Sequence, residues 1–263
     1  MTWLQRLHYV WVRAGLVVLV VSPLAMFLLF RAQGLPVDTF TTTADIRVTE
    51  TSEYIEFEPR GRDTQFGQVM LLPGCPADPR AYAPLARGVA ARGVRSVIVT
   101  VPYRCAPWPQ HQAELRRRVL SLMEKCVQCQ WALAGHSRGV RHVLELVRLL
   151  PNHRRNEIAS LVLMASTHPR DEDYSDLPMR VLKILGSEDG VAPADDALGN
   201  RRLLPPTTRW EIIEGGNHAQ FAYYAFQLFD GRATISRDEQ HRRVVELIVV
   251  SVLDWLGTEK PPS

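Results

Sequence analysis

The chain has 263 residues, 46% of them hydrophobic, which is enough to bury the core of one large domain. Three arginines and no acidic residue lie in the first 31 positions, so 28 basic and 28 acidic residues remain beyond them. A formally neutral remainder without a clustered Lys and Arg surface argues against a nucleic-acid-binding protein.

The first predicted element is an apolar helix. Residues 14–30 carry no charge and are bounded by Arg13 and Arg31. Seventeen residues extend about 25 Å as a helix, slightly less than a hydrocarbon core of about 30 Å. We therefore expect a membrane anchor over residues 1–34, with the transmembrane part at about 14–30, in contact with the lipid bilayer.

A cleaved signal peptide is the alternative for this segment. No convincing small-x-small cleavage site follows the apolar run, so we expect an uncleaved anchor. Arg6 and Arg13 precede the apolar run and Arg31 follows it, which favours a cytoplasmic N-terminus. The protein is then a single-pass protein of the cell membrane, and residues 35–263 lie outside the cytoplasm.

Residues 35–263 are expected to form one α/β domain. Residues 41–57 alternate polar and apolar side chains, as in an antiparallel edge hairpin. Buried-strand runs then alternate with helical patterns, which predicts a mostly parallel sheet of about eight strands with helices on both faces. The expected strands are 69–72, 97–101, 131–134, 161–165, 179–186 and 210–214, and the expected helices are 81–92, 111–125, 140–150 and 236–257.

The sequence Gly-His-Ser-Arg-Gly at 135–139 is the most informative motif. It lies between the expected strand 131–134 and the expected helix 140–150. Glycines two residues before and after a serine allow a strained strand-to-helix turn that exposes the hydroxyl. The pattern predicts that Ser137 is a nucleophile, and the alternative is a glycine-rich turn of a nucleotide-binding fold.

A nucleophilic serine needs a base and an acid that orients the base, and on this kind of sheet they follow in the order Ser, Asp, His. Asp189 follows one predicted strand, and His218 follows the next in a Gly-Gly-Asn-His loop. We predict that Asp189 orients His218, the general base. Glu188 and the acidic run 171–173 are the alternative carboxylates; Glu188 is one residue out of place, and the acidic run is typical of a solvated loop.

Seven other histidines compete with His218 for the role of the base, but none combines the chain order with a loop at a strand end. His136 is expected to pack within the turn, and His153 and His168 are expected to be solvated in polar connections. The remaining four lie near the membrane or in helical patterns: His8, His111, His142 and His241.

The oxyanion of an acyl-transfer reaction needs two N–H donors. One comes from the residue after the nucleophile, here Arg138. The other comes from the loop after the third strand, where Pro73 and Pro76 have no N–H to donate. Gly74 and Cys75 remain, and we favour Cys75; a plain strand-to-helix turn is the alternative reading of this loop.

These motifs resemble those of the alpha/beta-hydrolase superfamily over roughly residues 41–257. The likeness is closest to small members with short lids, similar to dienelactone hydrolases and related bacterial esterases. It rests on Pro73-Gly74 and on residues 78–86, 135–139, 186–190 and 215–221. The resemblance implies a hydrolase fold, a triad of Ser137, Asp189 and His218, and an oxyanion site at Cys75 and Arg138. Acyl transfer to water by such a triad needs no metal or organic cofactor.

The chain departs from these relatives at two positions. Dienelactone hydrolases proper resemble the chain in fold but use a cysteine nucleophile, so Ser137 argues against their substrate. Cys75 lies where relatives often carry a glycine, which narrows the expected oxyanion pocket.

Four cysteines bear on the compartment. Cys75 and Cys105 follow the third and fourth strands, which are neighbours in the fold implied by the resemblance, so they can pair. Cys126 and Cys129 form a Cys-x-x-Cys pair, a disulfide or a redox motif, but the helix start typical of thioredoxin is missing. Zinc-ligand spacing is missing too. We expect two disulfides in an oxidising compartment.

The expected reaction is hydrolysis of a small-molecule carboxylic ester or thioester through an acyl-enzyme. Only residues 168–177 lie where lids are inserted in the resembling family, so we expect an open site. The Arg138 side chain is either solvated or pairs with an anionic substrate. The alternatives are a peptidase or acyltransferase on the same triad, and a non-catalytic anchored binding module.

Overall fold

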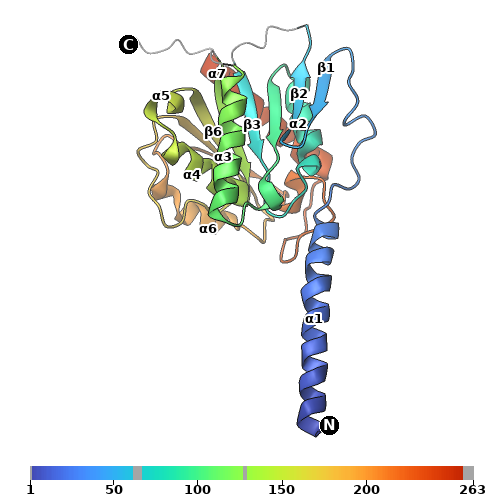
Figure 1. The fold of residues 1–263 in the computed structure, drawn as a ribbon. Helices are drawn as coiled ribbons and strands as arrows, with labels where there is room; N and C mark the ends of the chain where they lie inside the picture. The colour runs from blue at the N-terminus through green and yellow to red at the C-terminus, as the bar shows by residue number, and fades with distance from the viewer. Residues whose placement is uncertain (1, 62–66, 127–128, 257–263) are drawn as a thin grey trace.

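An eight-stranded sheet forms the centre of the domain, in the order β1-β2-β4-β3-β5-β6-β7-β8 (Figure 1). The computed structural model describes residues 2–61, 67–126 and 129–256. β1 pairs antiparallel with β2 and β2 with β4, whereas the pairs from β4 to β8 are parallel. The strands are β1 Ile46–Glu50, β2 Tyr54–Pro59, β3 Gly67–Leu72, β4 Arg95–Val99, β5 Gln130–His136, β6 Ile158–Met164, β7 Arg180–Gly186 and β8 Arg209–Ile213. The predicted α/β class and mostly parallel sheet are confirmed.

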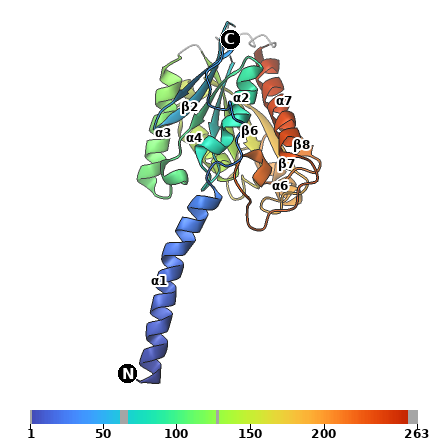
Figure 2. The same cartoon turned by 90° about the vertical axis from the view of Figure 1, so that its right-hand side faces the viewer.

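Helices cover both faces of the sheet (Figure 2). One apolar core cluster contains buried residues of α2 and α7, and a second contains those of α3 and α4. The helices are α1 Trp3–Leu29, α2 Ala83–Ala91, α3 Pro109–Glu124, α4 Arg138–Leu149, α5 Asn152–Arg155, α6 Ala194–Gly199 and α7 Arg237–Leu256. The predicted final helix extended to residue 257, which lies outside the described residues.

Strand burial explains the sequence pattern. Every residue of β3 is buried, because a central parallel strand is covered on both faces and so reads as a continuous apolar run. β2 instead alternates half-buried and buried residues, as an antiparallel strand near the edge does. The predicted edge hairpin over 41–57 therefore forms at residues 46–59.

The N-terminal helix α1 projects from the domain as a single rod (Figure 1). It begins at Trp3 because Thr2 and Gln5 form a reciprocal capping box, so it starts earlier than the apolar run at 14–30. None of its residues is buried, and its length and hydropathy are sufficient to cross a membrane. Phe30 ends the helix and is the first buried residue of the domain core.

The carboxyl ends of the parallel strands meet at one edge of the sheet. The loops that follow the parallel strands at this edge are residues 73–78, 100–108, 165–179, 187–193 and 214–235, together with Ser137 after β5. We call this region the carboxyl edge. The predicted triad, the candidate oxyanion donors and Cys105 lie in it or beside it, whereas Cys126 and Cys129 precede β5 at the opposite edge. α1 leaves the domain from the side of the carboxyl edge (Figure 1).

A buried lysine lies inside the sheet on β7. Lys183 is 1% exposed, and its ammonium donates a hydrogen bond to the carbonyl of His168. Burial lowers the pKa of Lys183 from 10.5 to about 7. Between these values the unfolded chain binds the proton and the folded chain does not, so this residue makes stability rise with pH.

Lys183→Met is expected to raise the free energy of unfolding at pH 7 by roughly 2 kcal/mol, because a similar volume then fills the site without a buried charge. The gain should shrink as the pH rises toward and beyond 10.5, because the lysine then loses its charge in the unfolded chain as well. Thermal unfolding of both proteins at pH 7 and pH 10 measures it. The same gain at both pH values would contradict the explanation.

Candidate active site

Ser137 lies at the turn between β5 and α4. Its backbone has φ 53° and ψ −120°, a strained conformation that projects the half-buried side chain above the sheet. A Cβ on Gly135 would lie 2.6 Å from the Gly139 carbonyl carbon, and one on Gly139 would lie 2.2 Å from the Leu72 oxygen. Both flanking glycines are therefore required by close backbone approach.

His218 and Asp189 meet at the carboxyl edge. The Nδ1 of His218 lies 2.9 Å from Oδ2 of Asp189, and both side chains are almost completely buried. The other carboxylate oxygen accepts hydrogen bonds from the backbone N–H groups of Val191 and Ala192. These bonds fix the carboxylate so that it orients the imidazole and leaves Nε2 facing away from it.

The other candidate carboxylates do not take this place. Glu188 is adjacent in the chain, but its side chain accepts a hydrogen bond from Ser187. In the acidic run, Glu172 pairs with Arg148, and the Asp173 carboxylate accepts a hydrogen bond from the Ser175 backbone.

Ser137 and His218 both lie at the carboxyl edge, but they are not joined by a direct hydrogen bond. The His218 ring centroid lies 4.7 Å from that of His136, the residue before the serine. Among the described residues, no hydrogen bond joins Ser137 to His218, and the buried Nε2 of His218 has no partner there. Hydrogen bonds of this kind are often long in enzymes without bound substrate.

Asp230 was not singled out in the sequence, yet it holds the loops of the site together. Its carboxylate accepts hydrogen bonds from the backbone N–H groups of His218 and Ala219 at 3.1 and 2.8 Å, and from Gly190 at 3.3 Å. The Asp189 turn and the His218 loop therefore share one acceptor. Asp230 lies in a loop without periodicity, so only its Asp-Gly pair signals a turn.

Gln240, also unpredicted, fixes the residue before the histidine. It is fully buried on α7, accepts a hydrogen bond from the Asn217 N–H at 3.0 Å and donates one to the Asn217 carbonyl at 2.9 Å. The sequence signal that could have identified Gln240 is a polar residue on the buried face of a helix. This paired contact ties the His218 loop to the final helix.

His136 packs within the turn, as predicted. The Tyr82 hydroxyl lies 2.7 Å from its Nδ1, and the ring stacks on Phe221. Burial holds the pKa of His136 well below its usual value, and the neighbouring His218 ring lowers it further. His136 is therefore a neutral packing partner for the His218 ring.

The loop after β3 lies directly against the serine turn. A Cβ on Gly74 would lie 3.1 Å from the Ser137 Cβ. Gly74 and Cys75 were the two candidates for the second oxyanion donor. The N–H of Gly74 already donates a hydrogen bond to the Tyr82 hydroxyl at 2.9 Å. Within the described part of the chain, the N–H groups of Cys75 and Arg138 have no hydrogen-bond partner, and the Arg138 side chain is exposed.

Two disulfides are present. Cys75 is joined to Cys105, with Cα atoms 4.7 Å apart, and Cys126 is joined to Cys129. The first links the loop after β3, in which Gly74 lies against Ser137, to the loop after β4. Within residues 2–61, 67–126 and 129–256, no cluster of three His, Cys, Asp or Glu side chains is arranged to hold a metal.

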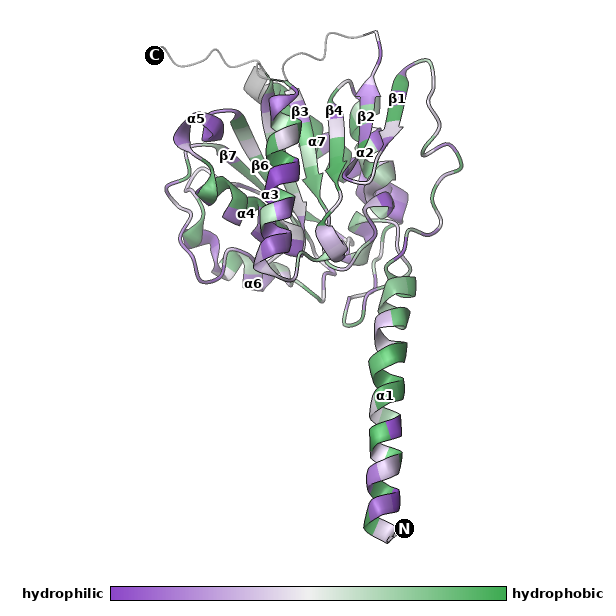
Figure 3. Ribbon diagram, viewed as in Figure 1, coloured by the Kyte–Doolittle hydropathy of each residue, from purple (hydrophilic) through white to green (hydrophobic). Residues whose placement is uncertain are grey.

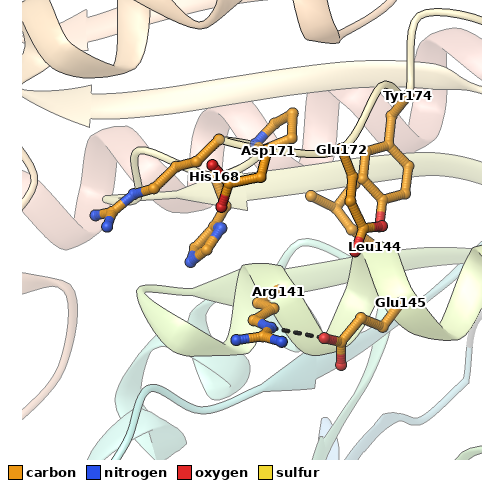
Figure 4. A pocket seen from close by; sticks show the side chains of 9 residues that line it. Arg141, Leu144, Glu145, His168, Asp171, Glu172 and Tyr174 are labelled. Atoms are coloured by element: carbon orange, nitrogen blue, oxygen red, sulfur yellow. Dashed lines mark hydrogen bonds and ion pairs between the residues drawn. The ribbon is translucent and has the colours of Figure 1, made fainter.

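A cavity of about 100 Å³ lies between α4 and the loop after β6 (Figure 4). Arg141 pairs with Glu145 on one wall, and His168 lies on the other. His168 differs from the prediction of a solvated side chain: it is half-buried, and burial, with nearby Arg170 and Arg141, lowers its pKa to about 4. The loop folds back onto α4, which a polar sequence does not reveal.

Solved structures share the fold at low sequence identity. Carboxyl esterase 2 from the mycorrhizal fungus Tuber melanosporum matches with a TM-score of 0.61 and 9% identity, over 85% of this chain and 91% of its own. Est1E from Butyrivibrio proteoclasticus matches at 0.56 and 10%, over 82% and 100%. A candidate dienelactone hydrolase from Klebsiella pneumoniae matches at 0.57 and 13%, over 81% and 99%. No curated protein sequence matches this chain.

The family model described as alpha/beta hydrolase family matches residues 68–242. That range runs from β3 into α7 and contains the serine turn, Asp189 and His218. The match spans more than half of the chain and agrees with the sheet order and with the strained turn after β5. The chain therefore belongs to the alpha/beta hydrolase family.

Proposed function

We propose that the protein is a membrane-anchored serine hydrolase that cleaves a carboxylic ester or thioester. The observation that carries the proposal is the buried pair of His218 and Asp189 beside the strained backbone of Ser137. A strained serine costs stability, and it is expected where the exposed hydroxyl has a chemical use.

Ser137 Oγ attacks the ester carbonyl carbon while Nε2 of His218 takes the hydroxyl proton. The carbonyl electron pair moves onto oxygen, and Asp189 stabilises the imidazolium through Nδ1. Collapse of the intermediate breaks the bond to the leaving alcohol or thiol, which receives the proton from His218. Water then attacks the acyl-enzyme with His218 again as the base. Collapse of this second intermediate releases the acid and returns the proton to Ser137.

The oxyanion is held by the N–H groups of Cys75 and Arg138. The support is that Gly74 already donates to Tyr82, whereas these two groups have no partner among the described residues. The disulfide from Cys75 to Cys105 holds the loop in place before the substrate arrives. Donors fixed in advance cost no reorganisation when the charge develops.

The N-terminal helix is the anchor. Phe30 packs in the domain core directly after the helix, so α1 is continuous with the folded domain, which favours an uncleaved segment. The two disulfides favour an oxidising compartment. With Arg6 and Arg13 before the apolar run, they support a domain outside the cytoplasm at the cell membrane.

A fluorophosphonate probe tests the nucleophile. The full chain in detergent is expected to take up the label, with the modified peptide containing Ser137, and Ser137→Ala is expected to remain unlabelled. Ser166→Ala is the matched control, since Ser166 is a buried serine in the loop after β6, and it should label as the unsubstituted protein does. Labelling of Ser137→Ala equal to that of the unsubstituted protein would overturn the proposal. In a separate assay, rates of hydrolysis of a panel of esters, thioesters and amides distinguish an esterase from a peptidase.

A further inference from the structure

The carboxyl edge is joined to α1 without a linker. The carbonyl of Phe30 accepts a hydrogen bond from the Asp78 N–H at 2.8 Å, and the Leu29 carbonyl accepts one from Ala225 at 3.2 Å. The Phe30 ring packs 5.1 Å from that of Tyr224. Hydrogen bonds donated by the domain to carbonyl groups at the end of the helix therefore fix the two together.

The length of the helix places this edge at the membrane surface. The 27 residues of α1 extend about 40 Å, close to the thickness of a bilayer including its headgroups. Its apolar part runs up to the domain (Figure 3). The guanidinium of Arg104, on the domain, lies over the ring of Phe27 in the last turn. A domain in contact with that turn lies at headgroup level.

Exposed aromatic side chains are concentrated at the same edge. Outside α1, the large aromatic side chains that are exposed in the described residues are Tyr103, Trp108, Phe226 and Phe229, with 76%, 57%, 54% and 83% exposure. Leu228, between the two phenylalanines, is 64% exposed. The other exposed large apolar residues of the domain are aliphatic: Val37, Leu149, Ile212, Val250 and Leu253. Aromatic residues gathered on one side are typical of a membrane–water interface.

These side chains border the active site from two directions. A Cβ on Gly190, next to Asp189, would lie 2.3 Å from the carbonyl oxygen of Phe229, so the aromatic loop touches the Asp189 turn. Tyr103 is in the segment that contains Cys105, the disulfide partner of Cys75. In Figure 1 the loop that contains Phe226 and Phe229 lies beside the domain end of α1.

We propose that the carboxyl edge docks onto the bilayer that holds α1, and that the site takes acyl esters residing in that bilayer. The proposal rests on the proposed function for the chemistry and for the anchor. Phe226, Leu228 and Phe229 enter the boundary between headgroups and acyl chains on one side of the site, and Tyr103 and Trp108 lie against it on the other. A lipid ester then reaches Ser137 without crossing bulk water.

Quenching by brominated lipid tests the docking independently of catalysis. Leu228→Trp and Leu149→Trp are compared as full chains in phosphatidylcholine vesicles with and without brominated acyl chains. The two leucines are equally exposed, at 64% and 61%, but Leu149 ends α4 about 18 Å of helix away from Ser137. Both variants keep the same six native tryptophans, so their difference isolates the added one. A larger loss of fluorescence for Leu228→Trp is expected, and equal losses would overturn the docking.

The substrate class is tested with a second pair of variants. Phe226→Ser with Leu228→Ser is expected to lower hydrolysis of a long-chain ester embedded in vesicles about tenfold relative to that of a water-soluble short-chain ester. Leu149→Ser should leave this ratio unchanged, and an unchanged ratio in the double variant would overturn the assignment of a bilayer substrate. Flotation of the protein with the vesicles measures whether α1 anchors it, and fluorophosphonate labelling measures whether Ser137 is reactive. A failure of the proposed function is therefore distinguished from a failure of the docking proposal.

Discussion

Replacing His218 with alanine is expected to lower kcat for an ester by a factor on the order of 10⁶. The hydroxyl of a serine is a weak nucleophile at neutral pH, and the His218 ring, in its buried pair with Asp189, is the proposed base. Without that base the proton has no acceptor as the bond to carbon forms. Steady-state hydrolysis of a soluble ester, with detergent-solubilised full chain, measures the loss.

Two companion variants make this result specific. Asp189→Asn should lower kcat about 10⁴-fold, because an amide can hold the ring but favours the wrong tautomer. His153→Ala removes an exposed histidine of α5 and should leave kcat unchanged. Activity of His218→Ala within tenfold of the unsubstituted protein would exclude His218 as the general base.

Gly139→Ala is expected to destabilise the fold by on the order of 4 kcal/mol, or a drop of roughly 10 °C in Tm. A Cβ there would lie 2.2 Å from the backbone oxygen of Leu72, and the position of a Cβ is fixed by the backbone of its own helix. Since backbone cannot rotate away as a side chain can, α4 would have to shift away from β3. Circular dichroism of the solubilised chain during heating measures the change.

Gly199→Ala is the matched control for that variant. Gly199 also lies in a helix, α6, but an added Cβ meets no atom within 4 Å. It should be neutral or slightly stabilising, because alanine favours a helix more than glycine does. Equal Tm values for Gly139→Ala and Gly199→Ala would refute the steric requirement at the serine turn.

The parts of the fold that depend on local pattern could be predicted from the sequence. Continuous apolar runs identify the central strands because both faces are covered. The serine turn is predictable because its glycines are required by close approach over only a few residues. Chain order and strand ends then select Asp189 and His218, which the structure places within hydrogen-bond distance of each other.

The supporting contacts could not be predicted, because they join segments that are distant in the chain and have no shared pattern. Asp230 comes from an irregular loop, and Gln240 and Tyr82 come from helical segments on the face covered by α2 and α7. Their partners are backbone groups of other loops, which any residue type supplies. The apolar run at 14–30 also did not indicate where α1 starts. The helix includes residues 3–13 because the capping box of Thr2 and Gln5, rather than hydrophobicity, sets its beginning.

The direct junction at Phe30 has a mechanical consequence. Because Asp78 and Ala225 hydrogen-bond to the last residues of α1, the sheet cannot swivel freely about the helix axis, and any tilt of the helix is transmitted to the domain. Helix tilt responds to the mismatch between helix length and bilayer thickness. For the proposed membrane anchor, the lipid composition is therefore expected to set how closely Ser137 approaches the acyl chains, because helix and domain tilt together.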